Sequence, residues 1–219
     1  MEFGRAFTYP FEDQDWLKKI ALAALVSLIP IVGQLFLLGW GLEIARRVIQ
    51  HDPVVLPDLD FGANLGKGFQ AFLVSLVYSI PIFILSLPMN LIGPIGSALE
   101  FDADSINMMM IAVSICCGGL TLIYSIALAF ALPAAFGNLA AKGQLSAGFK
   151  FSEIFALIKA APVAYLLVVL GSLVAGIIGS LGVIACAIGV IFTYAYAMAI
   201  MGHLYGQAYN QATAAGAAV

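Results

Sequence analysis

Four long stretches of the chain contain no charged residue, and this feature limits the possible folds more than any other. They run from Ile20 to Leu42, from Gly68 to Leu99, from Ser105 to Ala141, and from Ala160 onward. A helix crosses the hydrocarbon core of a bilayer with about 20 mostly apolar residues, and each stretch reaches that length. Apolar residues make up 63% of the chain and charged residues 10%, whereas soluble domains are about 45–50% apolar and about 25% charged. The sequence therefore predicts an all-α integral membrane protein.

Glycine and proline divide the longer stretches into single spans. The run Gly179-Ser180-Leu181-Gly182 favours a turn, and Pro133 is expected to kink or end the third stretch. The second stretch is expected to end at Pro88, Gly93, Pro94 and Gly96. We therefore predict one transmembrane helical domain over residues 1–219. It contains an interfacial N-terminal segment at 1–19, a first apolar segment at 20–49, and four full spans at 68–88, 106–133, 161–178 and 183–201.

The first apolar segment, 20–49, allows two interpretations because cations flank it on both sides. Lys18 and Lys19 precede it, and Arg46 and Arg47 follow its apolar part. A re-entrant hairpin that turns at Pro30-Ile31-Val32-Gly33 keeps all these cations on one side, as the enrichment of cations in cytoplasmic loops favours. Its limbs would be Trp16–Leu28 and Gln34–Ile49. The alternative is a single kinked spanning helix, and we favour the hairpin.

The distribution of cations also predicts the orientation. One loop is flanked by Arg46, Arg47 and Lys67, and another contains Lys142, Lys150 and Lys159, whereas the loop Glu100–Asp104 is acidic and has no cation. Short cytoplasmic loops are enriched in Lys and Arg. We therefore expect a multi-pass protein of the cell membrane with its cationic loops in the cytoplasm and the Glu100–Asp104 loop outside.

Two groups of residues are expected at the membrane interface. Tyr9, Phe11 and Trp16 mix with carboxylates before the first apolar segment, as aromatic interface anchors do. Glu43 adjoins an apolar helix and lies three and four residues before Arg46 and Arg47, on the same helical face. We interpret these three residues as an interfacial charge pair at a helix end.

The N-terminal quarter of the chain resembles a known family. The resemblance rests on Phe7-Thr8-Tyr9-Pro10-Phe11, Asp15-Trp16-Leu17-Lys18-Lys19-Ile20, Pro30-Ile31-Val32-Gly33-Gln34, Gly39-Trp40-Gly41-Leu42-Glu43-Ile44-Ala45-Arg46-Arg47-Val48, and Leu56-Pro57. These segments are similar to those of the prokaryotic membrane proteins grouped as domain-of-unknown-function family 4013. The resemblance implies a bacterial or archaeal multi-spanning membrane protein and assigns no catalytic residue.

Small residues recur at helical spacing in the last two predicted spans. Ser172, Gly176 and Ser180 follow each other every four residues, and Gly202 and Gly206 repeat the spacing farther on. Such residues let helix backbones approach closely in lipid. We predict that they pack the bundle internally or contact another copy or another membrane protein, and that Gly176→Leu would force helices apart.

Signals for chemistry are weak. The sequence contains no G-x-S-x-G, H-E-x-x-H, P-loop or G-x-G-x-x-G motif, and we expect no enzyme activity. His203 and His51 are the two histidines, and the sequence places them in different segments, so no metal or cofactor is predicted. We interpret Cys116, Cys117 and Cys186 as apolar core residues. The net charge of -3 gives no basis for nucleic-acid binding.

Two functions remain, and polar residues discriminate between them. The first is a non-enzymatic scaffold or accessory subunit that acts within the bilayer among membrane lipids. The alternative is a small channel or transporter for neutral or apolar solutes or lipids. Transport predicts that the polar residues of the apolar segments converge on one water-filled cavity, whereas a scaffold predicts that they cap or cross-link helices. These residues are Ser27, Gln34, Ser75, Tyr78, Ser79, Ser86, Asn90, Ser114, Thr121, Tyr124 and Ser125.

Overall fold

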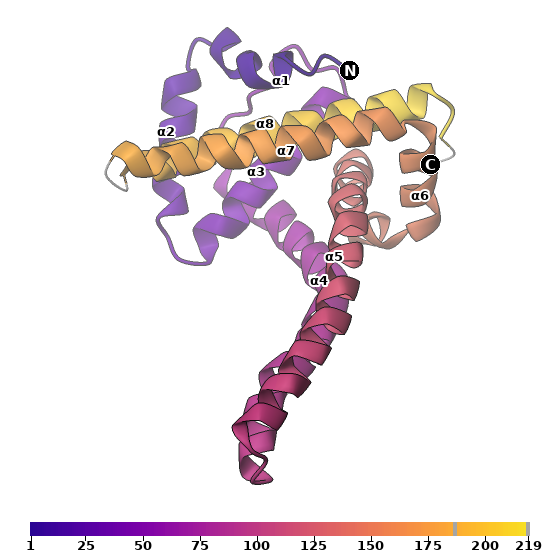
Figure 1. Cartoon of the computed structure of the whole chain (residues 1–219). Helices are drawn as coiled ribbons and strands as arrows, with labels where there is room; N and C mark the ends of the chain where they lie inside the picture. Colours follow the sequence, from indigo (N-terminus) through magenta and orange to yellow (C-terminus); the bar gives the residue numbers. More distant parts are fainter. Residues whose placement is uncertain (186–187, 218–219) are drawn as a thin grey trace. The chain divides into compact units, whose positions relative to one another are not determined.

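The computed structural model describes residues 1–185 and 188–217, without the side chains of residues 185 and 188. Within these ranges, every regular element is helical (Figure 1). The short elements are α1 (Arg5–Thr8), η1 (Tyr9–Glu12), η2 (Leu145–Phe149) and η3 (Gly182–Ala185). The longer helices are α2 (Trp16–Ser27), α3 (Val32–Ile49), α4 (Phe61–Ala98), α5 (Ala103–Lys142), α6 (Phe151–Ala160), α7 (Pro162–Leu181) and α8 (Ile188–Ala214).

The helices form two compact units. One unit contains Met1–Val74 and Phe130–Val219, and the other contains Ser75–Ala129. Helices α4 and α5 each pass from the first unit into the second. The core of the first unit surrounds α8, which packs against α7, α3 and α2; α7 and α8 lie side by side along most of their length (Figure 1).

Three helices of the described ranges are long and apolar enough to cross a membrane: Phe61–Ala98, Ala103–Lys142 and Pro162–Ile184. Two of them extend well beyond the predicted spans 68–88 and 106–133. The third predicted span, 161–178, lies within α7 and its continuation, apart from its first residue. The fourth predicted span, 183–201, is not among the three; its described residues belong to η3 and to α8, which begins at Ile188, and residues 186 and 187 lie outside the described ranges. Four full spans are therefore not confirmed.

Pro88 and Pro94 do not end α4 where they stand, contrary to the prediction, and Pro133 does not end α5, which excludes one of the two outcomes predicted for it. Helix α4 continues through Pro88 and Pro94 to Ala98, and α5 continues through Pro133 to Lys142. A proline removes one backbone hydrogen bond and adds a local clash. In a helix as long as α4 or α5, the hydrogen bonds of the many turns on both sides of the proline remain, so the helix persists.

The first apolar segment folds as a helical hairpin. Helix α2 ends at Ser27 and α3 begins at Val32, close to the predicted turn at Pro30–Gly33. Ile31 has a positive φ of 64°, and a Cβ atom at Gly33 would lie 2.3 Å from the carbonyl oxygen of Val26. The turn therefore needs a glycine at position 33, and the single kinked helix is not what the backbone forms. The depth of this hairpin in a membrane stays a prediction.

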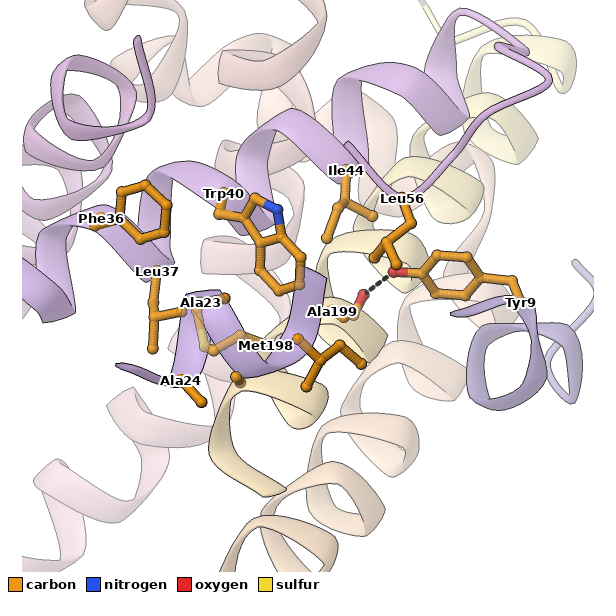
Figure 2. Close-up of a cluster of buried hydrophobic side chains, with 12 residues drawn as sticks. Tyr9, Ala23, Ala24, Phe36, Leu37, Trp40, Ile44, Leu56, Met198 and Ala199 are labelled. Atoms are coloured by element: carbon orange, nitrogen blue, oxygen red, sulfur yellow. Dashed lines mark hydrogen bonds between the residues drawn. The ribbon is translucent and has the colours of Figure 1, made fainter. Parts of the chain in front are cut away.

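An apolar cluster joins the hairpin to α8 (Figure 2). Trp40, Phe36 and Leu37 of α3 are fully buried, and they pack with Ala23 and Ala24 of α2 and with Met198 and Ala199 of α8. Tyr9 enters the same cluster, and its hydroxyl donates a hydrogen bond of 3.0 Å to the carbonyl oxygen of Ala199. Burial of these large side chains holds the N-terminal segment, the hairpin and α8 together.

Tyr9 is therefore a core residue, which corrects its prediction as an interface anchor. It is 3% exposed, and its ring stacks on the ring of His203 with centroids 4.3 Å apart. Phe11 is 52% exposed and packs edge-on against Trp16, with centroids 4.8 Å apart. Phe11 thus lies at the surface, as the interface prediction requires, whereas Trp16 is partly buried against the apolar cluster. The place of both residues at a membrane stays a prediction.

Candidate functional site

The densest charge cluster of the described residues surrounds Glu43. Its carboxylate is 2.5 Å from the guanidinium of Arg46, 3.4 Å from that of Arg47 and 2.5 Å from the ammonium of Lys67. The Glu43 side chain is only 8% exposed, whereas those of Arg46 and Lys67 are 38% and 34% exposed. The cluster contains the predicted group Glu43, Arg46 and Arg47, and it adds Lys67 from α4.

The cations keep Glu43 ionised. Burial alone would raise the pKa of this carboxyl, but hydrogen bonds from Arg46 and Lys67 lower its pKa to about 2. Three positive groups against one carboxylate leave a surplus of two positive charges in the cluster. The cluster therefore has a net positive charge that a bound anion would offset.

A cavity of about 320 Å³ opens beside this cluster. Arg46, Lys67 and Gln70 supply its polar lining, while Leu42, Gly66 and Leu139 are among its other lining residues. A second cavity of about 300 Å³ is mainly apolar, with a lining that includes Leu38, Leu42, Ala71, Phe136 and Met198. Leu42 borders both cavities.

Two further clusters tie the connecting segments to the helices. The ammonium of Lys19 lies 2.7 Å from Asp13 and 3.3 Å from Asp58, and it donates to the carbonyl oxygen of Leu56 at 2.9 Å. Burial opposes the charge on Asp13, yet the hydrogen bond from Lys19 lowers the pKa of Asp13 below its usual value. This cluster connects the N-terminal segment with the loop between α3 and α4.

The other cluster is centred on Glu153 of α6. Lys142 lies 2.7 Å and Lys150 3.1 Å from its carboxylate, and the amide of Asn138 donates to it at 2.8 Å. Lys142 and then Asn138 lower the pKa of Glu153 to about 2. The cluster holds α6 against the C-terminal end of α5.

The sequence analysis did not identify Lys67, Lys19 and Glu153 as cluster members. For Lys67 and Lys19, their position in the sequence could have indicated a charged partner. Lys19, Glu43, Lys67 and Lys142 each stand directly at the edge of an uncharged stretch. A charge at such an edge is close to apolar surroundings and therefore needs a partner. The pairing of one edge with another depends on tertiary structure.

Both histidines line a cavity of about 610 Å³, together with Arg5, Gln207 and Asn210. The two histidines, which lie in different segments of the sequence, thus border the same cavity. His203 is buried and lies beyond the predicted span 183–201; burial and the charge of Arg5 lower its pKa to about 4. No group of three or more His, Cys, Asp or Glu side chains in the part of the chain that the structure describes could hold a metal ion.

The small residues divide into two sets. Gly202 and Gly206 are buried where α8 crosses α3: a Cβ atom at Gly202 would lie 2.3 Å from the carbonyl oxygen of Gly41, and one at Gly206 would lie 2.6 Å from that of Ala45. Gly176 has open space around it, and Ser180 is exposed. The face of α7 that contains Ser172, Gly176 and Ser180 therefore does not hold this bundle together.

At least five of the eleven polar residues of the apolar segments, among them Asn90, donate side-chain hydrogen bonds to helix carbonyls. Ser27, Ser79 and Ser86 donate to carbonyl oxygens three or four residues earlier. The hydroxyl of Tyr124 donates a hydrogen bond of 2.8 Å to the carbonyl oxygen of Tyr78, which links α5 to α4 within the second unit.

Cys116 and Cys117 are free thiols, and Cys116 is exposed rather than buried. Cys186 lies outside the described residues.

A family model matches residues 22–188, and its description is "Protein of unknown function (DUF4013)". Among curated proteins and solved structures, none matches the chain. The family match begins within α2 and includes α3, the Glu43 cluster and the three membrane-compatible helices. Because it covers more than half of the chain, the protein belongs to the DUF4013 family.

Proposed function

We propose that the protein acts within the bilayer of the cell membrane as a non-enzymatic scaffold or accessory subunit. The observation that carries this proposal is the surface of the second unit, Ser75–Ala129. None of the residues in the most apolar stretch of α5 is buried, and large side chains such as Ile115 and Ile123 are 72% and 68% exposed. Such a surface is stable when lipid or another apolar helix covers it.

The hydrogen bonds of this unit favour a scaffold over a transport path. Ser79 and Ser86 bond to carbonyls of their own helix, and Tyr124 links two helices. These are the capping and cross-linking roles expected of a scaffold. A path for neutral solutes would instead use such groups as free partners for water or solute.

The proposed orientation follows from the charges. The cytoplasmic side would contain Arg46, Arg47, Lys67 and the segment Lys142–Lys159, and the Glu100–Asp104 loop would lie outside. The outward end of the α4–α5 hairpin would then be a short acidic loop, and the exposed apolar side chains of the second unit would offer a partner its main contact surface inside the bilayer.

Photo-crosslinking in native membranes tests the scaffold role. A photoreactive amino acid at Ile115 is expected to give one discrete protein adduct, and the same group at Ala135, which is fully buried, serves as the matched control and is expected to give none. Adducts with lipid alone from Ile115 would contradict the proposal.

Vesicle flux tests the alternative. Purified protein in liposomes is expected to leave the rate of glycerol entry, measured by stopped-flow light scattering, equal to that of protein-free vesicles. A clear increase in that rate would overturn the scaffold proposal in favour of a channel or transporter for neutral solutes.

A further inference from the structure

We propose that the two cavities that share Leu42 as a lining residue form a binding site for one anionic phospholipid, with its phosphate beside Arg46 and Lys67 and one acyl chain in the apolar cavity. The inference requires a protein in a bilayer, but it does not depend on the scaffold role.

The first argument is the order of the lining residues along three helices. On α3, Leu38 lines the apolar cavity, Leu42 lines both, and Arg46 lines the cationic cavity. On α4, Ala71 lines the apolar cavity and its neighbour Gln70 the cationic one. On α5, Phe136 is apolar lining and Leu139, one turn on, belongs to the cationic cavity. On each of the three helices, the lining thus changes from the apolar to the cationic cavity within four residues.

This order matches the uncharged stretches of the sequence. Leu38, Ala71 and Phe136 lie inside those stretches, whereas Arg46 and Lys67 lie just outside their edges. The apolar cavity therefore lies on the uncharged side and the cationic cavity on the charged side. This arrangement is complementary to an amphiphile at a membrane surface, whose chain is apolar and whose headgroup is charged. Basic pockets between helices on the cytoplasmic side are known to suit anionic headgroups.

The second argument is charge and access. The cluster has two more positive charges than negative ones, and one lipid phosphate would compensate part of that surplus. Arg46 and Lys67 are each more than a third exposed, so they can contact a ligand while they remain bonded to Glu43. Arg offers several donors in a plane and Lys a mobile ammonium, and both bind phosphate oxygens.

The third argument concerns size and selectivity. The apolar cavity, at about 300 Å³, lies at the lower end of the range for ligand sites and suits part of one chain. A free phosphate would leave this cavity unfilled, and a zwitterionic lipid would not offset the positive charge. An anionic phospholipid satisfies both cavities at once.

The test uses the full-length protein, delipidated in a non-ionic detergent, and three probes: dioleoyl phosphatidylglycerol, dioleoyl phosphatidylcholine and inorganic phosphate. Binding is measured by native mass spectrometry and by the rise in Tm. We expect one phosphatidylglycerol per protein, bound about tenfold more tightly than phosphatidylcholine, and no rise in Tm with inorganic phosphate.

Two variants locate the site. Lys67→Gln removes one cation. Gly66 lines the cationic cavity, so Gly66→Leu adds an apolar side chain there without changing any charge. The position has room for it, because a Cβ atom at Gly66 meets no other atom within 4 Å. Each variant is expected to abolish the preference for phosphatidylglycerol. Gly176→Leu, at an open position of α7, is the matched control and is expected to keep it.

The remaining outcomes overturn the proposal. Equal binding of the two lipids would remove the role of the charge surplus, and a rise in Tm with inorganic phosphate alone would indicate a free-anion site. A preference that survives Gly66→Leu would place the lipid elsewhere. If Lys67→Gln fails to fold, Gly66→Leu still decides, and none of these results changes the crosslinking or flux tests.

Discussion

Glu43 shows how much of this fold depends on single charged residues at helix ends. It is the acceptor for two cations of its own helix and one of α4. Without its carboxylate, three cations would face each other in a partly buried site. Loss of this carboxylate is expected to lower the free energy of unfolding more than loss of an exposed ion pair, because the remaining partly buried cations would be desolvated without a compensating negative charge.

We therefore expect Glu43→Gln to lower the free energy of unfolding by about 2–4 kcal/mol. Glu12→Gln is the control, because Glu12 pairs with Arg5 at 3.4 Å on the surface, where such pairs contribute about 0–1 kcal/mol. Unfolding in detergent with increasing denaturant measures both variants. Equal losses in the two would contradict a special role for Glu43.

The same carboxylate predicts a pH dependence. Its pKa is about 2 in the folded protein against 4.5 for the unperturbed group, so its contribution is complete above about pH 4.5 and is lost as the pH falls toward 2. Tm of the native protein should decline over this window. Because Glu153 also has a lowered pKa, the decline is expected to be smaller, but not absent, in Glu43→Gln; identical profiles for the two proteins would exclude Glu43 as a cause.

At the scale of elements, close approach of backbones determines how the helices cross. Gly202 of α8 lies against Gly41 of α3, so closely that a Cβ atom would be 2.3 Å from a carbonyl oxygen. Backbone atoms cannot turn aside as the end of a flexible side chain can. A methyl group at this position must therefore separate the two helices.

Gly202→Ala is expected to destabilise the protein by about 1–3 kcal/mol. Gly176→Ala is the matched control, since the position has open space, and it should leave stability unchanged or slightly raise it through better helix propensity. Thermal unfolding in detergent compares the two. A larger loss for Gly176→Ala would restore the packing role that the sequence assigned to this face of α7.

The sequence predicted local features of the elements well and their contacts less well. The turn at Pro30–Gly33 and the break after α7 depend on residues at the site itself, so they were predictable. The packing face of α7 was not, because Gly171, Ala175 and Gly179 repeat the four-residue spacing one position before Ser172, Gly176 and Ser180. The first set is the buried one, and only the position of α8 distinguishes them. The contact between Lys67 and Glu43 was not predictable for the same reason, because it joins residues that are far apart in the sequence.

At the scale of the whole molecule, the proposed function depends on which surfaces face the cytoplasm. The helical hairpin α2–α3 brings Lys18, Lys19, Arg46 and Arg47 within one folded unit. If the hairpin enters and leaves from the cytoplasm, all nine cations of the chain lie on the side that the positive-inside rule favours. A spanning first segment would leave three of them, Arg5, Lys18 and Lys19, outside.

Labelling of single cysteines in intact cells decides between these topologies. In a background without the three native cysteines, residues Gln14, Gln50 and Ala103 are replaced one at a time; all three are exposed in the structure, so protection would report the side of the membrane and not burial. We expect an impermeant thiol reagent to label Ala103→Cys alone, and all three variants to react after the cells are opened. Labelling of both Gln14→Cys and Ala103→Cys, with Gln50→Cys protected, would establish an outside N-terminus. The hairpin would then cross the membrane despite limbs of 12 and 18 residues, shorter than the roughly 20 that a full crossing requires, and the proposed cytoplasmic position of all the cations would be wrong.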